Sequence, residues 1–272
     1  MCIRFAIAAM IGAAVTLCPS GATAQSWSFP GLANDEFKAI QPGGPPPTRD
    51  LTGAWDPGGA GIAGGDAYFN GRQMAPLTPM GKDMLSRNRP GHGPESAKVF
   101  EGNDPLTTRG DPSGFPRIVN YEFRPIRVVQ IPNAVLMMYS FNQTWRIIWT
   151  DGRPLPEDPD PRWFGYSVGR WEDNDTFVVD TVGMTDRTWV DSGGYPHSEA
   201  LRVQERYDRV GVNVIELTVT INDPEIYTKP WQSRTRLPLK RLPDNTDFLE
   251  QVYAASEVTE YKEDIAVKTK TP

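Results

Sequence analysis

Cysteine is nearly absent from this chain of 272 residues, which has only Cys2 and Cys18. Both lie before residues 22–24, Ala-Thr-Ala, a small-residue pattern at which we expect a signal peptidase to cut. Arg4 and the short apolar run that follows it complete a secretory signal over residues 1–24. The mature chain then has no cysteine, which excludes disulfides, a thiolate nucleophile and cysteine metal ligands. We predict a soluble protein that is periplasmic or secreted.

Long apolar runs, basic clusters and histidines are also scarce. No segment after the signal has the apolar length of a membrane-spanning helix, so we expect no membrane association after cleavage. A formal net charge of −6 without a basic stretch argues against nucleic acid as a partner. The two histidines, His92 and His197, are far apart, and the chain has neither a phosphate-binding loop nor a dinucleotide fingerprint. We therefore predict no metal and no cofactor. The oligomeric state stays open.

Glycine and proline are abundant over residues 25–116, which predicts an extended arm because this composition buries little apolar area. Within the arm, residues 50–55 resemble a short strand that can dock on the main body. Thr78 and Pro79 have the residue types of a helix N-cap and first helical position, and they predict one short helix near 79–88.

From residue 117 to about 258 the sequence consists of short apolar or alternating runs separated by turn residues, which is the pattern of an antiparallel β domain. About ten successive strands leave exposed edges unless the sheet closes. We therefore predict an antiparallel β-barrel of the calycin or lipocalin type, or a strongly curved sheet, with a two-sheet β-sandwich as the alternative. A charged tail follows over 259–272. The expected strands are 117–123, 126–131, 134–141, 144–150, 165–172, 176–183, 201–209, 213–221, 231–239 and 247–255.

Two connections in this domain, 151–164 and 184–200, are longer than hairpin turns, and loops of that length are often functional. The first contains carboxylates interleaved with prolines, and it belongs to a candidate segment, 151–172, that also holds Trp163, Tyr166 and Trp171. Proline stiffens such a loop, so an acidic connection beside aromatic rings suits the mouth of a pocket. The alternative is a solvated connection whose tryptophans cap the core.

The second connection carries His197 with Asp186 and Asp191 nearby in the sequence. An imidazole with neighbouring carboxylates is the usual material for general acid–base catalysis. Arg187 and Arg206 would then hold an anionic group of the substrate. The alternative is a hydrogen-bonded structural histidine where a loop meets a strand.

A third candidate is Glu205, which alternates in phase with Leu201, Val203 and Tyr207. Either Glu205 points into a core or lumen and needs an arginine or hydrogen-bond partner, or the opposite, polar face of the strand lines a wet lumen. A buried carboxylate with a perturbed pKa would suit acid–base catalysis, and a structural ion pair is the alternative. The same ambiguity applies to Asp180 and Glu250.

The stretch DGRPLPEDPDPRWFGYSVGRWE, together with GYPHSEALRVQERY, is distinctive. It resembles a family of uncharacterised exported bacterial β-rich proteins, and the resemblance covers roughly residues 50–255. Relatives often have histidine where this chain has Tyr166. The resemblance implies an exported β-rich protein whose signature lies on the two long connections, and it implies no substrate.

We expect the two long connections to rim one opening of a closed sheet. The leading hypothesis is a barrel that binds a small organic ligand, aromatic, lipid-like or sugar-like, against aromatic rings. The alternatives are a metal-independent hydrolase, lyase or isomerase that uses His197 with Asp186, Asp191 or Glu205, and a protein-interaction module. The predicted ligand-binding residues are Trp163, Tyr166, Trp171, Arg187, Trp189 and Arg206, and the tryptophans that crowd this region also include Trp145 and Trp149.

Overall fold

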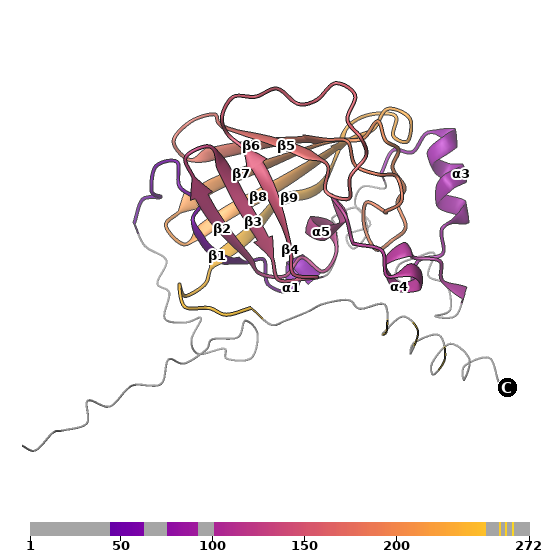
Figure 1. The fold of residues 1–272 in the computed structure, drawn as a ribbon, viewed down its shortest axis with the longest axis horizontal. Helices are drawn as coiled ribbons and strands as arrows, with labels where there is room; N and C mark the ends of the chain where they lie inside the picture. The colour runs from indigo at the N-terminus through magenta and orange to yellow at the C-terminus, as the bar shows by residue number, and fades with distance from the viewer. Residues whose placement is uncertain are drawn as a thin grey trace, which may run out of the picture.

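The computed structural model describes residues 44–62, 75–91 and 101–248, with the single residues 256, 259 and 263. Short helices lie to one side of a barrel of strands (Figure 1). The elements are β1 (Gly53–Asp56), α1 (Gly59–Ile62), α3 (Pro79–Arg87), α4 (Pro105–Arg109), α5 (Arg117–Asn120), β2 (Ile126–Ile131), β3 (Ala134–Tyr139), β4 (Thr144–Trp149), β5 (Tyr166–Trp171), β6 (Thr176–Val182), β7 (Arg202–Gly211), β8 (Val214–Asn222) and β9 (Trp231–Arg241).

The strands form a closed barrel in chain order, β1 to β9, and β1 closes it against β9. This confirms the prediction of a mainly β chain with a closed barrel. Each described pair of neighbours is antiparallel except β4 and β5, which are parallel. Parallel neighbours need a connection that returns along the barrel. The long connection between β4 and β5 supplies it and arcs along the outside of the barrel (Figure 1).

Eight of the ten expected strands are β2 to β9. The run 117–123 is not a strand but contains the buried helix α5, because a short apolar run does not distinguish a strand from a buried helical turn. The run 247–255 lies mostly outside the described residues. Residues 53–56 of the predicted arm form β1 and pair with both β2 and β9, so this part of the arm belongs to the barrel.

The short helix predicted near 79–88 is α3. The Thr78 hydroxyl caps its N-terminus by accepting a hydrogen bond from the Gly81 backbone N–H at 3.0 Å, and Pro79 takes the first helical position. Of the helices in the described ranges, none is long and apolar enough to cross a membrane.

The barrel interior is filled by side chains. Strand alternation sends Phe177, Val203 and Leu217 inward, where they join a continuous apolar cluster with residues from the other strands. Phe115 and Phe123, which flank α5 in the sequence, belong to the same apolar cluster. The barrel is therefore a packed core rather than an open lumen of the lipocalin kind.

Candidate functional site

The parallel junction of β4 and β5 is as short as the junction of β1 with β9, and these two have the fewest paired positions in the barrel wall. Strands β4 and β5 pair at Ile148 with Ser167 and at Trp149 with Val168, whereas β2 and β3 pair at six positions. Beside this β4–β5 seam lies a groove of about 340 Å³. We call it the seam groove. It is lined by Trp145, Arg146, Ile147, Trp149, Arg153, Pro154, Pro156, Arg162, Phe164, Gly165, Tyr166, Ser167 and Val168.

One wall of the seam groove combines a tryptophan of β4 with an arginine of the long connection. The Arg153 guanidinium lies 3.7 Å from the centre of the Trp149 ring. Asp151 fixes this arginine by accepting hydrogen bonds from its Nε at 2.9 Å and its Nη2 at 2.6 Å. These hydrogen bonds lower the pKa of Asp151. Proline-stiffened backbone follows directly, so the connection presents this wall in a defined position.

The other wall repeats the arrangement on β5, where the Arg162 guanidinium lies 4.0 Å from the centre of the Tyr166 ring. The Arg162 backbone is held at both ends, since its N–H donates to Gly183 and its carbonyl accepts from Thr185, each at 2.9 Å. Gly165, which directly precedes Tyr166, has φ +62°, and a Cβ at this position would lie 2.5 Å from the Val182 carbonyl oxygen. Glycine therefore allows the chain to lie against β6 and turn Tyr166 toward the groove.

Arg146 and Ser167 line the groove and also belong to a buried polar network inside the barrel. The Arg146 guanidinium pairs with both carboxylate oxygens of Glu205, at 3.2 and 2.8 Å, and donates to Ser167 at 3.0 Å. It also donates to the Tyr139 hydroxyl and lies 3.8 Å from the Phe115 ring centre. The side chains of Arg146 and Glu205 are 1% and 0% exposed, so water does not screen their charges.

The two tyrosines of this network are kept neutral by the same burial. The Tyr207 hydroxyl donates to Glu205 at 2.7 Å. Burial raises the pKa of Tyr139 to about 12 and raises the pKa of Tyr207 well above its ordinary value, while the Glu205 carboxylate raises the pKa of Arg146. Thus Glu205 points into the core with an arginine partner, one of the two arrangements that its strand phase allowed. It is not hydrogen-bonded to His197.

His197 is fully buried and both of its ring nitrogens are engaged. Nδ1 lies 3.1 Å from the Ser198 carbonyl oxygen, which can only accept, so Nδ1 carries the proton. Nε2 then accepts from the Thr188 hydroxyl at 3.0 Å. Burial lowers the pKa of His197, which favours the neutral ring. The geometry is that of a structural histidine and leaves no nitrogen for a substrate.

The carboxylates expected beside His197 are not its hydrogen-bond partners. Asp186 is exposed and acts on His197 only through a weak electrostatic effect. Asp191 is buried, and its Oδ1 accepts from the backbone N–H groups of Gly193 and Tyr195. Its Oδ2 has no hydrogen-bond partner in the described part of the chain, and burial raises the pKa of Asp191 to about 6.

Of the six predicted ligand-binding residues, Tyr166 lines the seam groove and the others lie elsewhere. Trp171 packs on Phe177 inside the wall, with ring centres 5.1 Å apart. The other four make structural contacts. Arg187 lies on the Trp163 ring and pairs with Asp111, and Trp189 is buried beside Arg117. Arg206 pairs with Glu172 and Asp208 on the outer face of β7.

The two long connections do lie side by side. Arg162 forms a parallel bridge with Met184, at the point where one connection ends and the other begins. The two connections do not rim an open lumen, because the barrel interior is filled by the apolar cluster to which Phe115 belongs. The seam groove lies on the side of the barrel instead.

Sequence reasoning missed the arginines of the groove. Arg146 alternates in phase with the buried Ile148, so its inward direction was readable from strand phase alone, whereas its pairing with Glu205 was not, because β4 and β7 are not neighbouring strands. Arg153 and Arg162 carry no such signal, since their positions depend on the path of an irregular connection.

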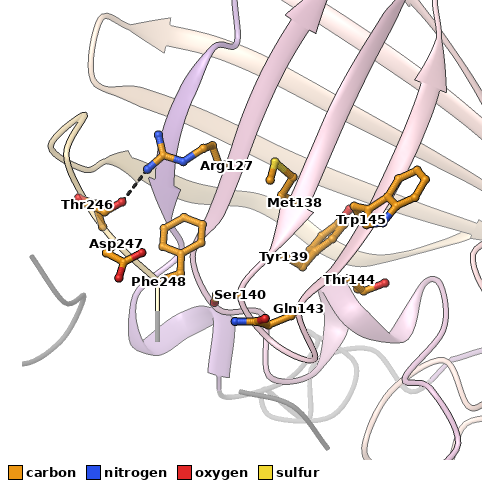
Figure 2. A pocket seen from close by; sticks show the side chains of 10 residues that line it. All are labelled: Arg127, Met138, Tyr139, Ser140, Gln143, Thr144, Trp145, Thr246, Asp247 and Phe248. Carbon is orange, nitrogen blue, oxygen red and sulfur yellow. Dashed lines mark hydrogen bonds between the residues drawn. The ribbon is translucent and has the colours of Figure 1, made fainter. Parts of the chain in front are cut away.

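A second groove, also of about 340 Å³, lies on the outer face of β2, β3 and β4. Figure 2 shows Phe248 and Arg127 on one side of it and Met138 and Trp145 on the other. Trp145, which is 61% exposed, lines this groove and the seam groove alike and forms the ridge between them. The Arg127 guanidinium donates to the Thr246 carbonyl and lies 5.5 Å from the Phe248 ring centre, so its cation is already used to hold the chain.

Asp180, the other carboxylate with an ambiguous direction, faces outward and pairs with Arg170, while Glu250 lies outside the described residues. The described ranges contain no group of three or more histidine, cysteine or acidic side chains placed to hold a metal ion.

Comparison with known proteins finds no matching family model, no similar curated protein and no similar solved structure.

Proposed function

We propose that this protein binds a small organic molecule with a flat ring in the seam groove. The supporting observation is the pair of rings, Trp149 and Tyr166, each held from one side by a stacked guanidinium. A ring system that is fixed in this way loses little conformational freedom when a ligand stacks on it. The volume of about 340 Å³ is within the range of small-molecule sites.

The groove supports binding better than the barrel interior does. The interior is occupied by the apolar cluster and by the Arg146–Glu205 network, whose hydrogen bonds a ligand would have to break. Acid–base catalysis has less support, because His197 is buried with both nitrogens engaged. The export of the mature chain remains part of this proposal and rests on the signal over residues 1–24.

The test is calorimetric titration with a panel of monocyclic and bicyclic aromatic compounds and pyranosides, compared between the wild type and Trp149→Ala. We expect at least one compound to bind with a Kd below about 1 mM, and Trp149→Ala to weaken it about fivefold or more through the lost stacking. Met138→Ala is the matched control, because Met138 is 45% exposed and lines only the second groove. The proposal fails if no compound binds, or if Trp149→Ala binds as tightly as the wild type.

A further inference from the structure

We infer that the ligand of the seam groove is an organic monoanion, with its carboxylate or sulfonate on Arg162. This inference rests on the proposed function and names the class of molecule that the site selects. It starts from the charges around the groove. Three arginines line it, Arg146, Arg153 and Arg162, and the part of the chain that the structure describes contributes no aspartate or glutamate to its lining.

Two of these three charges are already compensated. Arg146 is paired with the buried carboxylate of Glu205, and its side chain is only 1% exposed. Arg153 is paired with Asp151 through both Nε and Nη2. A ligand anion that approached either arginine would also meet the paired carboxylate, so neither adds a net attraction at short range.

Arg162 differs because its side-chain contact in the described part of the chain is with the Tyr166 ring rather than with a carboxylate. Stacking uses the face of a guanidinium, and the N–H groups project from its edge. That edge is the geometry that binds a carboxylate through two parallel hydrogen bonds. Arg162 is exposed, its backbone is fixed at both ends, and the cation therefore stands in a defined place with its donors available.

The charges and the rings together define the ligand. One uncompensated cation favours one acid group, and a second acid group would have to lie beside an arginine that is already neutralised. The aromatic lining from Trp149 to Tyr166 covers the rest of the molecule. Small aromatic carboxylates and sulfonates combine these two properties.

The experiment compares 2-naphthoate with 2-naphthamide, which have nearly the same shape and differ in charge, by calorimetric titration at low and high salt. For the wild type we expect 2-naphthoate to bind about tenfold more tightly or better, because a hydrogen bond to a charged group is the stronger kind. The advantage should shrink at high salt, since the site is exposed. The dianion 2,6-naphthalenedicarboxylate should bind no more tightly than 2-naphthoate.

Two variants locate the effect. Arg162→Gln should bind 2-naphthoate and 2-naphthamide equally, whereas Arg170→Gln should behave as the wild type, because Arg170 lies on β5 outside the groove and pairs with Asp180. Circular dichroism checks that both variants are folded. Equal binding of the two compounds by the wild type, or a charge preference that survives Arg162→Gln, overturns the monoanion inference alone. Absence of binding by both compounds and by every other ring compound in the panel overturns the proposed function with it.

Discussion

Arg146 lies inside the barrel and Arg162 on its outer surface, and each is in contact with the face of an aromatic ring. Inside, the arginine has a carboxylate, a serine, a threonine and a tyrosine around it. Outside, the ring of Tyr166 is the contact of the guanidinium among the described residues. Both sites stack an arginine on an aromatic ring, but only the buried arginine also has side-chain hydrogen-bond partners among the described residues.

The difference shows what burial requires. A charge inside a packed barrel needs an opposite charge and several hydrogen-bond partners, because water cannot replace them there. At the surface, water solvates an arginine until a ligand displaces it, so an unpaired cation costs little there and remains available. The buried network around Arg146 therefore indicates a structural role, and the exposed Arg162, which has fewer partners, is the better candidate for binding a ligand.

The largest effect is expected from Glu205→Gln, which leaves the Arg146 charge buried without its counter-ion. Loss of one partner from a buried pair typically costs about 3–5 kcal/mol in the free energy of unfolding. Urea unfolding followed by tryptophan fluorescence measures it. Glu216→Gln is the control, because its partner Arg236 is exposed on the outer face of the barrel, and it should change stability little.

The double variant Arg146→Met with Glu205→Leu sharpens the same comparison. Replacing both members of a buried ion pair with apolar side chains is often neutral. We expect the double variant to be more stable than Glu205→Gln. A double variant as unstable as the single one would show that shape, and not the unpaired charge, causes the loss.

A smaller, pH-dependent effect is expected from Asp191→Asn. Burial raises the pKa of Asp191 to about 6 from an ordinary value of 3.8, so the unfolded chain releases this proton at lower pH than the folded protein does. The folded state therefore loses stability as pH rises through this interval, by about 3 kcal/mol at most. Asparagine keeps an oxygen that accepts from Gly193 and Tyr195 but does not titrate.

Urea unfolding of Asp191→Asn and the wild type from pH 4 to pH 8 tests this expectation. The stability of the variant relative to the wild type should increase between about pH 4 and pH 6 and level off above pH 7. Asp186→Asn, an exposed change in the same connection, serves as the control. A difference between Asp191→Asn and the wild type that does not vary with pH would contradict the raised pKa.

The smallest effect on stability is expected from Arg162→Gln. The residue is exposed, and substitutions at such positions usually change the free energy of unfolding by less than about 0.5 kcal/mol. Its effect should appear in the binding of anions instead. A loss of stability comparable to that of Glu205→Gln would mean that Arg162 is part of the framework, and it would remove the contrast between the two arginines.

The barrel was predictable from sequence because several strands, such as β7 and β8, carry a period-two pattern and the turns from β2 to β3, from β5 to β6 and from β7 to β8 are short. The direction of Glu205 followed from the same pattern, with two arrangements left open. The groove was not predictable in this way. It depends on a parallel junction and on where a connection of irregular backbone places Arg153 and Arg162, and neither leaves a periodic trace. The structural role of His197 was one of two alternatives left open, because a loop has no repeating pattern from which its buried side can be read.

Closure of the barrel joins β1, near the start of the described chain, to β9, near its end. The last seam therefore forms only after almost the entire polypeptide has been made, and until then both terminal strands have open edges that are prone to pairing with other chains. Contacts between such distant parts of a sequence also form slowly, because the intervening chain must be ordered first. The edges of this molecule are thus more open to pairing with other chains before the barrel closes than after it has folded.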